Sequence, residues 1–124
     1  MEAVDINDIL GKCMSRLDWL EEAWYDWVIA DELVWISDYE RAAAYVKRSL
    51  RWLKRILQNP SKCEGFKEHV EWLAREIESI SEVNARTEGQ VSGLTPRFRY
   101  IFYELLVRCI LEEVQGRRVF KPPQ

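Results

Sequence analysis

The sequence predicts an all-α fold, an antiparallel four-helix bundle with room for one short additional helix. Apolar residues recur at spacings of three and four along most of the chain. No segment alternates between apolar and polar residues for long, as a half-buried strand would. Capping residues, prolines and glycines then divide the chain into four long segments.

The first expected helix spans about residues 8–35. Its apolar residues keep a helical spacing over that whole length, which predicts one uninterrupted helix packed along a neighbour. These residues are Ile6, Leu10, Cys13, Leu17, Leu20, Trp24, Trp27 and Val34. Asp31 is the one polar residue in the stripe.

The next two helices are predicted from their caps. Ser37, followed three residues later by an acid, has the spacing of a capping box and opens a second helix over about 38–58. An Asn-Pro pair ends this helix. Ser61, again with an acid three residues later, opens a third helix over about 62–83.

A fourth helix follows a polar stretch. Residues 84–93 include two glycines, so we expect a loop there. Thr95 and Pro96 then provide an N-cap and a first-turn proline for a helix over about 95–115. This helix is apolar nearly all round, so it is either the central helix or carries a homodimer interface on one face. The candidate interface residues are Phe98, Phe102, Tyr103, Leu106 and Ile110.

Length and composition limit the number of domains and the compartment in which the protein is expected. A chain of 124 residues has room for one hydrophobic core, so we expect residues 1–124 to form a single domain. No apolar run reaches the ~18 residues of a membrane span, and the acidic N-terminus lacks the basic start of a secretory signal. Three widely spaced cysteines (Cys13, Cys63 and Cys109) argue against a disulfide framework and predict the reducing cytoplasm. Many charges with few Asn and Gln residues are typical of a thermophilic source.

Residues suited to catalysis are few. The single histidine, His69, has no identifiable partner, and we expect it to be a half-exposed surface residue. Isolated glycines make no phosphate loop, and no zinc-ligand spacing occurs. Asp26 and Asp31 are candidate ligands or acid–base groups, yet a structural contact with an arginine such as Arg41 or Arg48 is the commoner arrangement. The sequence therefore favours a non-catalytic protein without a metal or cofactor.

Basic residues concentrate on the second expected helix. Residues 1–40 carry eleven acids and two bases, whereas residues 41–62 carry seven bases and no acid. On a helical wheel the bases occupy one arc opposite the apolar residues, so this arc faces solvent or a partner. It is either a phosphate-binding surface for RNA or DNA, or a solvated face paired with acids of a neighbouring helix such as Asp26.

The candidate nucleic-acid-binding residues are Arg41, Lys47, Arg48, Arg51, Trp52, Lys54 and Arg55. Trp52 lies at the border of the basic arc, where its ring could stack on bases. A second basic group lies in and after the fourth helix and consists of Arg97, Arg99, Arg117, Arg118 and Lys121.

Residues 20–57 carry a further pattern of small, acidic and aromatic residues. It comprises Ala23 and Asp26, Ala30-Asp31-Glu32-Leu33, Asp38-Tyr39-Glu40-Arg41-Ala42-Ala43, and Leu50, Leu53, Lys54 and Leu57. This pattern resembles the first helical hairpin of HEPN domains, over less than a third of the chain. The resemblance implies a bundle of four or five helices that dimerises, in toxin–antitoxin, defence or RNA-processing systems.

The nuclease motif of that family is absent. Many HEPN proteins are RNases with an Arg and a His separated by four to six residues. At that separation before His69 the sequence has Lys62, Cys63 and Glu64. The resemblance therefore implies a binding, antitoxin-like or scaffold member without nuclease activity.

Two hypotheses follow for function. The first is a non-catalytic, dimeric HEPN-like module that binds a partner protein, a nucleotide or RNA. The alternative is a small helical subunit of a nucleic-acid assembly that binds phosphates through the basic face of the second helix. In size, helicity and basic stripes the chain is similar to small subunits of CRISPR effector complexes and to viral nucleic-acid-coating proteins.

Overall fold

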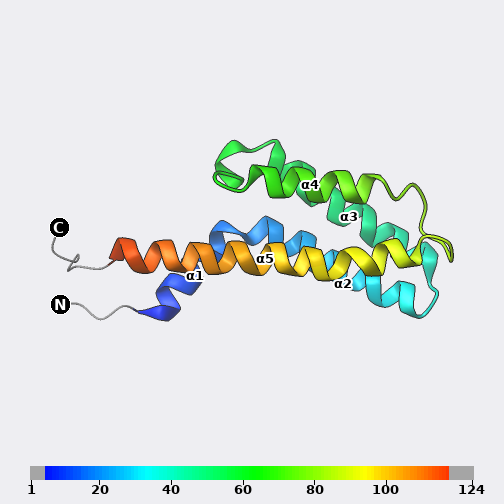
Figure 1. Ribbon diagram of the computed structural model, residues 1–124, viewed down its shortest axis with the longest axis horizontal. Coiled ribbons are helices and arrows are strands. Elements are labelled where there is room, and N and C mark those ends of the chain that lie inside the picture. Colours follow the sequence, from blue (N-terminus) through cyan, green and yellow to red (C-terminus); the bar gives the residue numbers. More distant parts are fainter. Residues whose placement is uncertain (1–4, 118–124) are drawn as a thin grey trace.

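The computed structural model describes residues 5–117, and every regular element in that range is helical. The predicted all-α class is confirmed. The five α-helices of the described range and one 3-10 turn are α1 (Ile6–Arg16), α2 (Asp18–Trp35), α3 (Tyr39–Leu57), η1 (Pro60–Lys62), α4 (Lys67–Glu78) and α5 (Glu88–Arg117) (Figure 1). None of these helices combines the length and the apolarity needed to cross a bilayer.

Helix α2 lies between α3 and α5. It packs most extensively on α3 and less on α5, while α4 packs on α3 and has few contacts with α5. The ring of Trp19 lies 6.4 Å from that of Trp52, and Asp26 pairs with Arg48, so α2 and α3 are antiparallel. The largest fully buried side chains are Trp27, Phe98, Ile9, Leu20, Leu53, Ile56, Leu73 and Ile77.

The α2–α3 turn matches its prediction to within one residue. Asp38, and not Ser37, is the N-cap of α3, since its carboxylate accepts a hydrogen bond from the Arg41 amide at 3.3 Å. Ser37 instead adopts a left-handed φ of 61°, and its amide donates to the Val34 carbonyl at the end of α2. This tight turn makes α2 and α3 a hairpin.

The prediction of one helix over 8–35 is wrong, because the chain breaks at Leu17 into α1 and α2. The residues Arg16-Leu17-Asp18 include neither Pro nor Gly, and at the break the Asp18 carboxylate accepts a hydrogen bond from the Trp19 amide at 2.7 Å. Helix α1 turns away and lies beside the C-terminal half of α5 (Figure 1), where Ile9 is fully buried.

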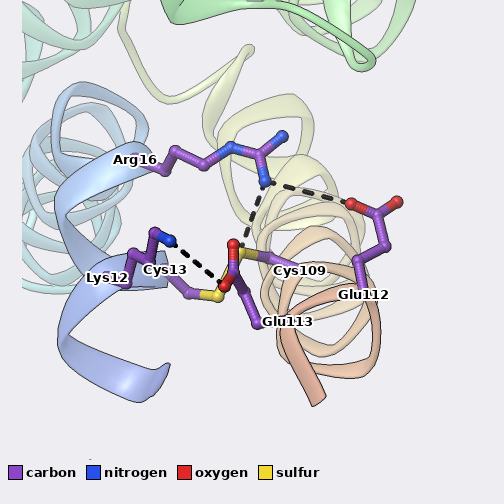
Figure 2. A network of polar contacts seen from close by, with 6 residues as sticks. All are labelled: Lys12, Cys13, Arg16, Cys109, Glu112 and Glu113. Carbon is purple, nitrogen blue, oxygen red and sulfur yellow. Dashed lines mark hydrogen bonds and ion pairs between the residues drawn. A yellow bond between two sulfur atoms is a disulfide. The ribbon is translucent and has the colours of Figure 1, made fainter. Parts of the chain in front are cut away.

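A disulfide between Cys13 and Cys109 joins α1 to α5 (Figure 2). The expectation that the cysteines are unpaired is therefore wrong for this pair, whereas Cys63 is free and buried. The two half-cystines are 96 residues apart in sequence, and spacing gave no signal that the fold brings them together. A cross-link over ~100 residues stabilises a fold by up to about 4–5 kcal/mol in the chain-entropy treatment.

The third helix is shorter than predicted, and the expected cap at Ser61 lies inside the 3-10 turn η1. Gly65 follows with a φ of 87°, a left-handed conformation that favours glycine and reverses the chain before α4. Helix α4 therefore begins at Lys67, and it ends at Glu78, five residues earlier than the sequence suggested.

The fourth predicted helix is α5, and it begins at Glu88, within the segment expected to be a loop. Thr95 is therefore not an N-cap. Its buried hydroxyl donates to the Val91 carbonyl at 3.3 Å and accepts from the Trp27 indole at 3.0 Å. Pro96 lies inside the helix and removes one backbone donor, a cost that tertiary packing has to offset.

Helix α5 is apolar nearly all round because it has a buried side and an exposed stripe. Phe98 and Phe102 pack inside the chain, so these two candidate interface residues belong to the core. Leu106 and Ile110 are half-buried beside α1. Tyr103 is exposed and belongs to a row of exposed apolar side chains that we call the outer stripe. The outer stripe consists of Tyr100, Tyr103, Val107 and Leu111.

Truncating the two sides of α5 should have different effects. We expect Phe98→Ala to lower the free energy of unfolding by about 3–5 kcal/mol, because it leaves a cavity beside Trp24 and Trp27. Tyr100→Ala, at an exposed position two residues away, should change it by less than about 0.5 kcal/mol. Urea unfolding followed by tryptophan fluorescence measures both values, and equal losses would contradict this assignment of the two faces.

Candidate nucleic-acid interface

Helix α3 has one buried and one basic face. Its buried residues are Ala42, Val46, Ser49, Leu53 and Ile56. The opposite side, which we call the basic face, consists of Arg41, Lys47, Arg48, Arg51, Lys54 and Arg55, all of them exposed. The helix thus brings together all six cations that the sequence singled out.

Three of these cations have acidic partners and three do not. Arg41 pairs with Asp38 at 3.4 Å and Lys54 with Glu78 at 3.8 Å. Both pairs are exposed, and such pairs contribute little to stability and exchange readily with other anions. The third paired cation is Arg48, which reaches Asp26. Among residues 5–117, no carboxylate lies within salt-bridge distance of the other three, Lys47, Arg51 and Arg55.

Arg48 reaches a buried carboxylate beneath the basic face. Its Nε lies 3.7 Å from Oδ2 of Asp26, whose side chain is 6% exposed. The expected contact between Asp26 and an arginine is therefore confirmed. Asp31, the other carboxylate in the stripe of α2, instead accepts a hydrogen bond from the Ser92 hydroxyl at 2.8 Å.

Burial raises the pKa of Asp26 above its ordinary range. Arg48 and, more weakly, Arg51 act in the opposite direction, while Glu22 adds to the increase. The ionised form of Asp26 is thus held by the cations of α3 against the cost of its burial. Removing those cations would leave a buried charge without compensation.

Trp52 does not present a free ring for stacking. It is half-buried, with the Arg55 guanidinium 5.2 Å above its centroid. The same guanidinium lies 5.3 Å from the ring of Trp19, and the Lys62 ammonium lies 4.9 Å from that ring. Cations over indole faces are favourable, so a base would have to displace Arg55 to stack here, whereas a phosphate would not.

A surface groove of about 570 Å³ follows this part of α3. Its lining consists of Arg48, Arg51, Trp52, Lys54, Arg55 and Gln58. Four of the six are cationic side chains, so the groove concentrates positive potential over an aromatic floor. Such a groove suits an anion that is longer than a single phosphate.

The sequence missed two residues of this site, Trp19 and Lys62. Trp19 is contributed by α2, and Lys62 by η1, where it pairs with Asp18 at 2.9 Å. Only the packing of the α2 N-terminus against the α3 C-terminus places them next to Arg55. Periodicity within one helix carries no signal for such a contact.

The second basic group is divided among other contacts. Arg97 lies 4.4 Å from the ring of Trp72 and 4.0 Å from Glu76, and Arg99 lies 5.8 Å from the ring of Trp24. The side chain of Arg117 lies outside the described part, as do Arg118 and Lys121. The described members therefore belong to the packing of α5 on α4 and α2.

The remaining candidate is His69. His69 is half-exposed on α4, as expected. Within residues 5–117, no three His, Cys, Asp or Glu side chains are grouped closely enough to hold a metal ion.

Comparison of the chain with protein-family models, curated proteins and solved structures finds no match. The resemblance of residues 20–57 to HEPN domains therefore stays a prediction.

Asp26→Asn should change how stability depends on pH. The folded-state pKa of Asp26 is raised, so the protonated carboxyl stabilises the folded state. This contribution to the free energy of unfolding is fully present below the unfolded-state pKa of about 3.9. It is lost as pH rises through the folded-state pKa. The free energy of unfolding of Asp26→Asn, relative to wild type, should therefore increase between pH 3 and pH 7. Urea titrations across this range test the sign, and a constant difference would show that Asp26 has an ordinary pKa.

Proposed function

We propose that this protein is a non-catalytic helical module that binds nucleic acid through the basic face of α3. The observation that carries the proposal is that three exposed cations, Lys47, Arg51 and Arg55, form no ion pair with an acid among the described residues, although the chain is acidic overall. A solvated face paired with neighbouring acids would have neutralised them. Phosphates are the anions that such surfaces most often bind.

The spacing of these cations favours a linear polyanion. Lys47, Arg51 and Arg55 recur every four residues and therefore form one row with steps of about 6 Å along α3. The groove beside the row is open over several side chains. With the indole of Trp52 covered by Arg55, binding through phosphates is favoured over recognition of bases.

The proposal includes a HEPN-like relationship and an antitoxin-like or scaffold role. The HEPN-like relationship is supported by the packing of α2 on α3. Ala23, Ala30 and Ala42 are fully buried there, and their small side chains let the two helices approach each other closely. Tyr39, the first residue of α3, is partly buried against the core, and its hydroxyl donates to the Glu88 carboxylate at 2.7 Å. The HEPN-like four-helix bundle and its dimerisation are part of the same proposal.

A second function, homodimerisation, is favoured by the outer stripe of α5. Tyr100, Tyr103, Val107 and Leu111 are 69%, 51%, 54% and 56% exposed. Four large apolar side chains in one row on a helix are typical of a protein–protein contact. Because the stripe and the basic face belong to different helices, a dimer could present two basic faces to one nucleic acid.

The disulfide bears on the proposed source and location. Cytoplasmic disulfides are rare except in hyperthermophiles, whose intracellular proteins are rich in them. A cytoplasmic protein of a thermophile is therefore the proposal that accommodates both the composition and the Cys13–Cys109 bond.

Neutralising the unpaired cations tests phosphate binding. We expect Lys47→Gln/Arg51→Gln to weaken binding of a labelled single-stranded RNA by on the order of tenfold or more at low salt. The slope of log K against log salt should fall by about two, one for each lost phosphate contact. Fluorescence anisotropy at several salt concentrations measures both quantities.

The matched control is Lys67→Gln/Arg75→Gln, which removes the same charge from exposed positions on α4. It should bind nearly as well as wild type. If the α3 and α4 variants lose affinity equally, binding depends on net charge alone, and if neither loses affinity the basic face is only solvated. Wild-type protein that forms larger assemblies on the RNA would identify the nucleic-acid-coating alternative.

Disrupting the outer stripe tests dimerisation. Val107→Glu places a charge in the middle of the stripe and should convert a dimer into a monomer, as measured by light scattering behind size exclusion. Ile36→Glu makes the same type of change at a more exposed position after α2 and should leave the mass unchanged. A wild-type monomer at ~100 μM, a concentration far above the Kd of a stable dimer, would rule out this contact.

A further inference from the structure

Helix α1 is attached to α5 through a small cluster that meets the main core at Leu106. Ile9, Cys13 and Cys109 are its buried members, and Leu106, Ile110 and Val114 pack around them. Two of these six residues come from α1 and four from the C-terminal half of α5. The main core does not include α1 side chains other than Met14 at its edge.

The polar contacts around the disulfide join the same two helices. Lys12 pairs with Glu113 at 3.4 Å and Arg16 with Glu112 at 3.9 Å, on either side of the sulfur atoms (Figure 2). Contacts between α1 and α2 are fewer than those between α1 and α5. The position of α1 therefore depends on α5 and hardly on the helix that follows it.

The joint between α1 and α2 is a single residue, Leu17. Its amide donates to the Cys13 carbonyl at 3.0 Å, and its carbonyl accepts from the Glu21 amide at 2.9 Å, as in a continuous helix. The apolar spacing also continues through the joint without Pro or Gly. Released from α5, α1 can extend in line with α2, because residues 16–18 include no Pro or Gly that would oppose a straight helix. The local cost is the hydrogen bond from the Trp19 amide to the Asp18 carboxylate, 2.7 Å long, which holds the bent joint.

We propose that reduction of the Cys13–Cys109 bond frees α1 to exchange between two copies of the chain. The α1 of each copy, aligned with its own α2, occupies the α5 surface of the other copy, and Cys13 of one chain faces Cys109 of the second. The occupant is α1 itself because that surface already fits Ile9, Cys13, Lys12 and Arg16 of the same sequence. Reciprocal exchange buries both copies of the surface and closes with two-fold symmetry. This proposal is independent of phosphate binding by α3.

The redox chemistry balances with thiol reagents alone. A dithiol reductant gives two electrons and two protons to the S–S bond, leaves Cys13 and Cys109 as thiols and becomes a disulfide itself. Glutathione disulfide reverses the reaction: the thiols of Cys13 and the second chain's Cys109 form the new bond, and two molecules of glutathione are released. Arg16 Nη1, 3.7 Å from Cys109 Sγ, is placed to stabilise negative charge on that sulfur during exchange.

Isotope mixing of the wild-type chain tests the exchange. Equal amounts of unlabelled and nitrogen-15-labelled protein are reduced with dithiothreitol at ~1 mM, reoxidised with glutathione disulfide and digested without reduction. About half of the peptides that link Cys13 to Cys109 should then carry one labelled and one unlabelled half, as random pairing between chains requires. A control kept oxidised, with free thiols blocked, should contain no mixed links. Links confined to one label after reduction would overturn the proposal.

A complementary pair of variants gives a second readout. In a Cys63→Ala background, Cys13→Ser and Cys109→Ser chains each lack one partner of the disulfide. Mixed and oxidised together, they should form a covalent heterodimer through the remaining Cys13 and Cys109, while neither forms a covalent dimer alone. Circular dichroism verifies that both are helical. Folded variants that give no heterodimer would contradict the exchange as firmly as unmixed isotopes would.

Discussion

The hydrogen bond from the Trp27 indole to the Thr95 hydroxyl, 3.0 Å long and fully buried, determines how α5 lies on α2. A buried indole N–H needs an acceptor, because leaving it unpaired costs about 1–3 kcal/mol. Thr95 can accept in this position because its own proton goes to the Val91 carbonyl one turn earlier, which requires a helical turn from Val91 to Thr95. The N-terminal part of α5 is helical although it includes Gly89, Gly93 and Pro96.

The length of α5 has consequences for both ends of the fold. Its 30 residues span about 45 Å, compared with about 27 Å for the 18 residues of α2, so α2 cannot cover it completely. Helix α1 covers part of the C-terminal half through the Cys13–Cys109 cluster. The outer stripe around Val107 has no cover within the described chain. The same excess length thus creates the surface that α1 occupies and the one available to a second copy.

The candidate site shows how far local patterns reach. The amphipathic spacing of α3 predicted its exposed cations, and the burial of Asp26 in a seam predicted its contact with Arg48, because both follow from one helix having a buried and a solvated side. The position of the Arg55 guanidinium over Trp52 also follows from a local pattern, because residues three apart are neighbours on a helix surface. The contacts of Trp19 with Arg55 and with Lys62 were not predictable, because they join residues of different elements.

The sequence by itself determined the helical class, the α2–α3 hairpin and the basic face, since periodicity, caps and tight turns act within a few residues of the chain. Tertiary structure decided where α1 lies, which side chain accepts from the Trp27 indole and which side of α5 is buried. The position of α1 on α5 includes a disulfide partner 96 residues away from Cys13. The acceptor for Trp27 is Thr95, inside α5 and 68 residues later in the sequence. Interactions of that range can outweigh the preferences of a loop, a cap or a continuous helix, because each preference amounts to only about 1 kcal/mol per residue.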